Sequence, residues 1–261
     1  MKELYCKTLK ALIVMGCFLF LGITTAEALT VSVEPNKAQR EVSGKVRVHI
    51  YAEGAENLVS MGVKITFDPT VLEVVEASKY EDVEKGWLMD ADGNPATTGD
   101  QFNNPAVQID NASGTVTMIG GHLKGTSTVG LNGKVLLGWI IFRAKANGTS
   151  NIHVDLGKYH PDHPAKTFDN FVKKDGVVDE PTNVPGDLGL ICVVNGACEG
   201  DTTGDNSVDF ADYAKFNAAW DSSFGDSTYD PACDLDGDGI VSFSDWALFN
   251  NDWNANCPSC P

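Results

Sequence analysis

The chain is poor in basic residues. Its 261 residues include 19 lysines and arginines against 36 aspartates and glutamates, which gives a formal net charge of −17. A surface of this sign repels the phosphates of nucleic acids and the anionic headgroups of membranes. The composition therefore argues against both as partners and favours a protein that binds cations.

Long apolar runs are also scarce, and the one that is present lies at the N-terminus. Residues 11–23 are apolar, follow three lysines and precede the small-residue site Ala26-Glu27-Ala28. This is the pattern of a secretory signal peptide, and the run is shorter than the roughly 20 residues that span a membrane. We expect residues 1–28 to be removed and the rest to be secreted, to the extracellular space or the cell surface. Lipidation of Cys17 is disfavoured because this residue lies inside the apolar run.

Cysteine is absent from residues 29–191. Five cysteines lie in the last 70 residues: Cys192, Cys198, Cys233, Cys257 and Cys260. In an oxidising compartment we expect disulfides, at most two of them, with one cysteine left over. A bridge from Cys198 to Cys257 or Cys260 would join the two ends of this region. Zinc binding by Cys257 and Cys260 is the alternative, and it lacks a histidine partner.

Motifs of hydrolytic enzymes are missing. The sequence contains no G-x-S-x-G, no H-E-x-x-H and no Cys–His pair placed for nucleophilic catalysis. His160 and His163 lie in a proline-containing segment and are interpreted as exposed residues rather than metal ligands. We expect no enzymatic activity.

The most informative feature is a duplicated segment near the C-terminus. Residues 201–220 and 234–253 are identical at ten of twenty positions. In each copy, oxygen-bearing side chains occupy positions 1, 3, 5, 9 and 12 of a 12-residue loop. This spacing surrounds one Ca²⁺ ion with about six to eight oxygens. Apolar residues at helical spacing follow each loop, so the pattern predicts two loop–helix units and two calcium ions.

The two loops are not equivalent. The second has Gly239 at position 6, where a sharp turn requires positive φ, whereas the first has Asn206 there and the weaker ligand Thr203 at position 3. We expect both loops to bind calcium and the second to bind it more tightly. A third acidic run, Asp90-x-Asp92-x-Asn94, has Gln101 at position 12 and is disfavoured as a site. The expected ligands are Asp201, Thr203, Asp205, Ser207, Asp209 and Asp212 in the first loop, and Asp234, Asp236, Asp238, Ile240 (through its carbonyl), Ser242 and Asp245 in the second.

Residues 29–194 have the pattern of short β-strands separated by turns. Alternation of apolar and polar residues, or a nearly continuous apolar run, marks four strands: Val46–Tyr51, Met61–Phe67, Thr115–Ile119 and Lys134–Phe142. Clusters of Gly, Asn, Asp and Pro separate them. The segment predicts one β-sandwich of two packed antiparallel sheets. Residues 70–77 fit either a short helix or a strand.

Both parts resemble known families. Val63–Val75 and Gly138–Ser150 resemble strands and turns of cohesin domains, which implies a jelly-roll β-sandwich. Gly200–Trp253 resembles a type I dockerin, which is a pair of calcium loops each followed by a helix. We therefore expect a mainly β chain. Its predicted parts are a signal peptide (1–28), a cohesin-like sandwich (29–194), a short connector (195–200) and a small α module with two calcium-binding repeats (201–261).

The dockerin resemblance implies a partner-binding surface. In that family, partner contacts lie at loop positions 10 and 11 and near positions 17, 18 and 22. The corresponding residues are Phe210, Ala211, Asn217, Ala218 and Ser222 in the first copy, and Phe243, Ser244, Asn250, Asn251 and Ala255 in the second. The two sets are similar, so the module has approximate two-fold symmetry and two possible docking orientations. Burial of Phe210 and Phe243 in the module core is the alternative.

Other apolar side chains of the repeats are expected in the core. The helical spacing predicts a module core from six aromatic residues and from the valines at loop position 8. These are Tyr213, Phe216, Trp220, Trp246, Phe249 and Trp253, with Val208 and Val241.

A chain that resembles both a cohesin and a dockerin has both halves of a docking pair. The leading hypothesis is an extracellular, calcium-dependent structural protein that self-associates head to tail, with filaments as the expected product. The connector of residues 195–200 reaches roughly 20 Å at full extension, so we expect the module to bind another copy rather than fold back. The alternatives are an adaptor between other secreted cohesin or dockerin proteins, as in cellulosome-like complexes, and a carbohydrate-binding adhesin.

Overall fold

The computed structural model describes residues 28–79, 107–121, 130–157, 159–160, 163–167, 171–173 and 175–260. The predicted signal segment before residue 28 and the acidic run at Asp90 lie outside these described residues. Within them, no helix is long and apolar enough to cross a membrane. The strands and helices are β1 (Thr30–Glu34), β2 (Lys37–Arg40), β3 (Lys45–Thr66), β4 (Leu72–Lys79), β5 (Gln108–Asp110), β6 (Thr115–Gly121), β7 (Leu131–Ala144), β8 (Gly148–Leu156), β9 (Tyr159–His160), β10 (His163–Thr167), β11 (Val172–Lys173), β12 (Gly186–Val193), α2 (Phe210–Ala219) and α3 (Phe243–Asn251).

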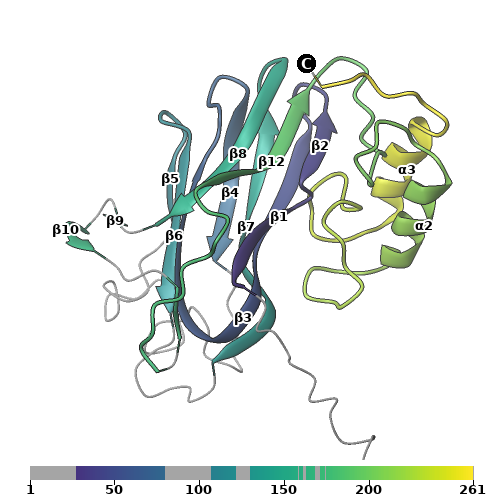
Figure 1. The fold of residues 1–261 in the computed structure, drawn as a ribbon. Coiled ribbons are helices and arrows are strands. Elements are labelled where there is room, and N and C mark those ends of the chain that lie inside the picture. The colour runs from purple at the N-terminus through teal and green to yellow at the C-terminus, as the bar shows by residue number, and fades with distance from the viewer. Residues whose placement is uncertain are drawn as a thin grey trace, which may run out of the picture.

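The strands form two layers that share one long strand (Figure 1). Strands β1, β3, β7 and β4 make one layer, and β2, β12, β8, β3, β6 and β5 make the other. The mainly β architecture predicted from the alternating pattern is thus confirmed. One detail differs, because β2 and β12 pair in parallel. Of the two alternatives for residues 70–77, the strand is observed, as β4 from Leu72 onward.

The two predicted strands Val46–Tyr51 and Met61–Phe67 lie in one strand of 22 residues, β3, which ends at Thr66, one residue before the predicted end. Its first half pairs with β1 and β7, and its second half pairs with β6 and β8. Between the halves, Gly54 and Asn57 have φ of 70° and 52°, and the register with β7 shifts. The prediction of two strands was wrong because a strand can bend at positive-φ residues without ending.

The C-terminal module has a small core of its own. Phe216 on α2 and Phe249 on α3 are 1% and 0% exposed and stack with ring centroids 5.2 Å apart. Val208 and Val241 are buried in the same cluster, as expected. Each helix begins with a capping box, in which an Asp or Ser N-cap and an Asp in the first turn bond each other's backbone amides.

One disulfide joins the two ends of the C-terminal module, and a second joins the module to the sandwich. Cys198 is bonded to Cys257, and Cys192 on β12 is bonded to Cys260. Cys257 and Cys260 therefore belong to separate disulfides and do not form the alternative zinc pair. Cys233 is the free cysteine, and it is buried.

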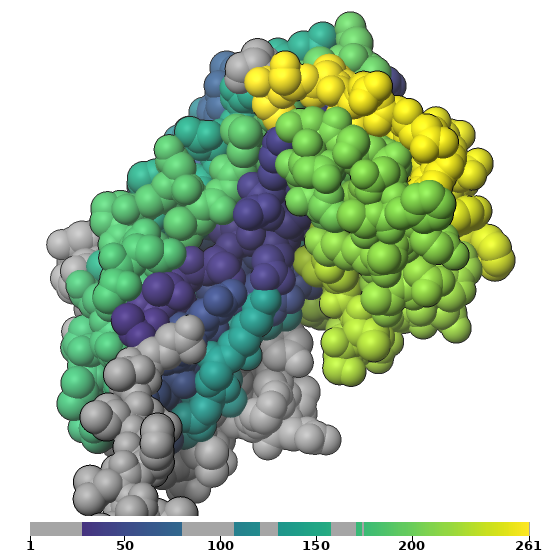
Figure 2. All heavy atoms as spheres, turned by 45° about the vertical axis from the view of Figure 1, so that its right-hand side comes forward, coloured from purple at the N-terminus to yellow at the C-terminus, as the bar shows by residue number. Residues whose placement is uncertain are grey.

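The module lies directly against the sandwich, beside the N-terminal strands (Figure 2). Its loops face strands β2 and β3, and its two helices are on the outer side (Figure 1). The expectation that a short connector makes folding back onto the sandwich difficult was wrong. A short connector prevents a large rotation, but it also holds the module near the strand from which the connector leaves.

Candidate calcium-binding and docking site

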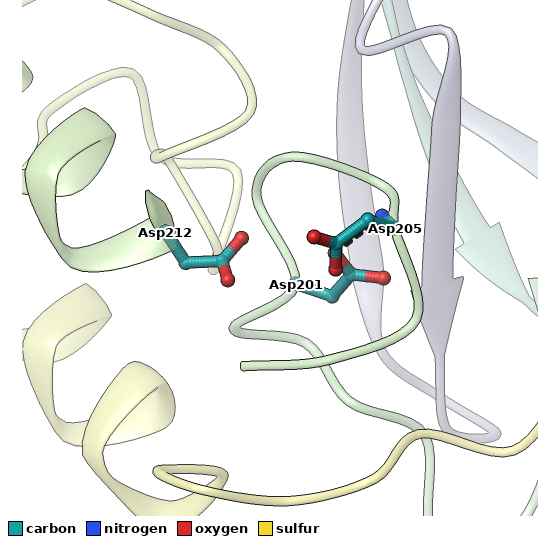
Figure 3. A group of neighbouring side chains, drawn as sticks. All are labelled: Asp201, Asp205 and Asp212. Carbon is teal, nitrogen blue, oxygen red and sulfur yellow. Dashed lines mark hydrogen bonds between the residues drawn. The ribbon is translucent and has the colours of Figure 1, made fainter. Parts of the chain in front are cut away.

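Loop one (residues 201–212) brings three carboxylates together. Oxygen atoms of Asp201, Asp205 and Asp212 lie within 4.8 Å of one another, and Asp212 approaches from the first turn of α2 (Figure 3). Backbone amides hold all three groups, and Asp205 accepts a bond from the amide of Ser207. Asp201 accepts bonds from the amides of residues 204–206, and Asp212 accepts bonds from the amides of Thr203 and Asp209. The loop is therefore folded around its acidic side chains.

Loop two (residues 234–245) repeats this arrangement with Asp234, Asp236 and Asp245, again within 4.8 Å. Asp245 is fully buried and accepts bonds from the backbone amides of Leu235, Asp236 and Ser242. Asp234 is also fully buried, and its Oδ1 atom has no hydrogen-bond partner. A buried carboxylate oxygen without a donor is costly unless a cation binds it. This donor set fits Ca²⁺, which prefers clustered carboxylate oxygens.

Burial opposes ionisation of these carboxylates. It raises the pKa of Asp234 to about 6, although the Tyr229 hydroxyl and Arg47 act in the other direction. Burial also raises the pKa of Asp201 and of Asp245. At neutral pH the folded loops therefore hold carboxylates at a free-energy cost, and a bound cation would remove it.

The other expected ligands occupy different places. Asp209 and Ser242, at position 9, cap α2 and α3. Asp238 is exposed, and its carboxylate accepts a hydrogen bond from the backbone amide of Ile240. Ile240 itself is 45% exposed. Thr203 is exposed, and the Ser207 hydroxyl donates to Asp205. At position 6, Asn206 and Gly239 both have positive φ (71° and 93°), as the turn requires.

The eight main partner-binding candidates are all exposed. Phe210 and Phe243 are 78% and 77% exposed, so the alternative in which they fill the core is wrong. Two expectations near them also fail. Ser222 is buried, with its hydroxyl bonded to the Ala219 carbonyl, and Tyr213 and Trp220 are exposed rather than core residues. The candidate set that is exposed is Phe210, Ala211, Asn217, Ala218, Phe243, Ser244, Asn250 and Asn251.

Aromatic side chains connect the two helices with approximate two-fold symmetry. Phe210 meets Trp253 edge to face with ring centroids 5.3 Å apart. Their counterparts, Phe243 and Trp220, meet in the same way at 5.0 Å. Each Phe at loop position 10 thus rests on the Trp that ends the other copy. A groove of about 210 Å³ lies beside the second pair, lined by Tyr213, Phe216, Asn217, Trp220, Phe243 and Trp246.

The sandwich contacts both loops with basic side chains. Lys37 on β2 donates to the carbonyl of Gly204 (3.0 Å) and to Oδ1 of Asn206 (2.6 Å) in loop one. Arg47 on β3 places Nε 3.5 Å from Oδ2 of Asp234 in loop two. No functional role for Lys37 or Arg47 was predicted from the sequence. The alternation along residues 46–51 correctly indicates an outward face there, but it does not show that the module covers this face.

Aromatic residues between the loops complete the contact. Phe224 and Tyr229 both pack on His49 of β3, at centroid distances of 5.3 Å and 5.6 Å. Phe224 also meets Trp139 of β7 at 6.4 Å. His49 is 1% exposed although its side chain is on the outward face of the strand. The module therefore buries a second, mixed polar and aromatic surface of the sandwich.

This burial predicts a pH effect. Desolvation, with Arg47 and Lys134 nearby, lowers the pKa of His49 from 6.5 to about 3. Unfolded chains therefore bind a proton below about pH 6.5 that folded chains do not, so stability is lost as the pH falls. We expect about 1.4 kcal/mol of loss per pH unit from this residue. Urea unfolding at pH 7 and pH 5 should show a smaller pH dependence for His49→Phe than for the unmodified chain, and equal dependence would contradict the assignment.

Comparison with known proteins returns structures but no sequence family. No family model and no curated protein matches the chain. Among solved structures, it is similar to a non-cellulosomal cohesin from Archaeoglobus fulgidus, with 13% identity over 65% of this chain and 93% of that one, at a TM-score of 0.43. A type I cohesin from Pseudobacteroides cellulosolvens is 18% identical over 65% of this chain and 94% of that one, at a TM-score of 0.42. A chain from a type I cohesin–dockerin complex of Clostridium thermocellum is 12% identical over 64% of this chain and 100% of that one, at a TM-score of 0.45.

Proposed function

We propose that this chain is an extracellular, calcium-dependent assembly protein whose C-terminal module docks onto the sandwich of another copy, head to tail. Calcium would bind at the carboxylates of loops one and two and stabilise the helices that display the docking face. The two disulfides support an oxidising compartment, where such bonds persist.

One observation carries the proposal. The module contacts its own sandwich through its loops, while all eight partner-binding candidates are exposed on the module. Exposed large aromatic residues such as Phe210 and Phe243 are typical of a protein-binding surface. Since the chain's own sandwich is engaged by the loops instead, this face is available to a second molecule.

The arrangement of the two parts favours open assemblies. Strands β5 and β6 lie on the side of the sandwich away from the module (Figure 1). A contact between the module of one copy and a distant surface of the next is heterologous. Such contacts generate filaments when the rotation between copies does not close a ring.

Sedimentation velocity of the mature chain tests this function. In millimolar calcium we expect species larger than the monomer whose size increases with protein concentration, and in excess chelator we expect the monomer. A chain that stays monomeric in calcium up to high concentration would contradict self-assembly. It would favour the adaptor function, in which the same exposed face binds a different secreted protein.

A further inference from the structure

The contact between the module and the sandwich contains three buried polar atoms without a hydrogen-bond partner. They are Nε of Arg47, Nε2 of His49 and Oδ1 of Asp234, and they are the buried side-chain atoms of this kind in the part of the chain that the structure describes. Two belong to the sandwich and one belongs to a calcium loop. Arg47 and Asp234 form an ion pair across this contact.

Arg47 is held in place on the side of the sandwich. Its guanidinium lies 4.4 Å from the ring centroid of Trp139 and 5.6 Å from that of Phe224. Contact with both rings favours this position of the cation, and its Nε lies 3.5 Å from Oδ2 of Asp234. The Tyr229 hydroxyl donates to the same oxygen at 2.5 Å. Together, these groups fix one oxygen of Asp234 and leave Oδ1 for a ligand.

The turn of loop two also rests on strand β3. A Cβ atom at Gly239 would lie 3.3 Å from Nη2 of Arg47, and one at Gly237 would lie 3.7 Å from the backbone nitrogen of Arg47. Both glycines have positive φ (93° and 76°). The backbone shape that the ligands need is therefore in direct contact with the sandwich.

Charge does not prevent Arg47 and calcium from being present together. Loop two carries four carboxylates, from Asp234, Asp236, Asp238 and Asp245. With one Ca²⁺ bound, it would still have two net negative charges, so a neighbouring guanidinium remains attracted to it. Loop one differs, because Lys37 contacts a carbonyl and an amide oxygen there rather than one of the three clustered carboxylates.

We propose that the sandwich completes the calcium site of loop two, with Arg47 as the positioning residue for the ligand Asp234. Calcium binding at loop two and seating of the module on its own sandwich then stabilise each other because both depend on the position of Asp234, and linkage makes the two effects equal. The disulfides hold the module at its chain ends, and the calcium-loaded loop two holds it against β3. The inference rests on the calcium binding in the proposed function, but not on assembly.

Calcium titration of the full mature chain, followed by amide NMR, tests the coupling site by site. Gly204 reports on loop one and Gly237 on loop two, because both occupy position 4. Arg47→Met keeps much of the packing and removes the charge. We expect Arg47→Met to raise, at least tenfold, the calcium concentration at which the Gly237 amide shift is half complete (its calcium midpoint). The calcium midpoint at Gly204 should change less than twofold. In the unmodified chain, the indole resonance of Trp139 should shift together with Gly237.

The matched control is Lys37→Met, which removes the basic contact to loop one and should leave the Gly237 midpoint unchanged. Arg47→Lys, which keeps the charge without the planar group, should give an intermediate midpoint and serves if Arg47→Met does not fold. An unchanged or lower Gly237 midpoint in the Arg47 variants overturns the inference while leaving the proposed function intact. If neither glycine responds to calcium, the calcium dependence in the proposed function fails.

Discussion

Assembly should be lost when Phe210 and Phe243 are both replaced by alanine. The two rings are 78% and 77% exposed, so removing them costs the folded monomer little. At a docking interface, buried aromatic side chains commonly contribute about 2 kcal/mol or more each. We therefore expect the double variant to weaken self-association by at least about 100-fold, measured by sedimentation in calcium.

Single variants and a matched control sharpen this result. Because Phe210 and Phe243 occupy equivalent positions, each single variant keeps one complete copy of the docking set and should lose much less than the double variant. Val177 and Val178 are 54% and 50% exposed on the sandwich, and their double alanine variant controls for loss of exposed apolar area. Unchanged assembly of the Phe210 and Phe243 double variant would place the docking surface elsewhere.

Local sequence patterns correctly predicted a helix after each of the two acidic loops. The loops and helices depend on spacing within about 20 residues, because a capping box, a position-12 carboxylate and a positive-φ position 6 are all short-range features. The observed helices Phe210–Ala219 and Phe243–Asn251 begin at position 10 of each loop, directly after the cap. The same locality explains the failure at Tyr213 and Trp220, since helical spacing does not show how far a two-helix core extends.

Long-range features were not predictable in this way. Alternation along β3 identifies Val46, Val48 and Ile50 as inward-facing, and all three are buried. It assigns Arg47 and His49 to the opposite face, but an outward face has the same pattern whether water or another module covers it. The basic and aromatic character of that face is the one available signal, because it complements the acidic loops of a chain with net charge −17.

The two position-12 aspartates should differ in importance, although their local bonding is alike. Asp212 and Asp245 are both fully buried and accept bonds from backbone amides of their own loops. Replacing Asp245 by alanine removes a proposed calcium ligand and takes this acceptor away from the backbone amides of Leu235, Asp236 and Ser242. We expect a loss of about 3–5 kcal/mol in calcium, with a large fall in the thermal unfolding midpoint.

Asp212→Ala is the matched control for that variant. It removes the corresponding group of loop one, whose contact with the sandwich, through Lys37, does not involve a clustered carboxylate. Loop two is additionally linked to β3 through Arg47 and Asp234, so disruption of this loop should also release the module from the sandwich. We therefore expect Asp245→Ala to lower the unfolding midpoint more than Asp212→Ala in calcium, and to change the fluorescence of Trp139 beneath Phe224. Equal losses in the two variants would mean that the loops are energetically equivalent and that the sandwich contact adds nothing to loop two.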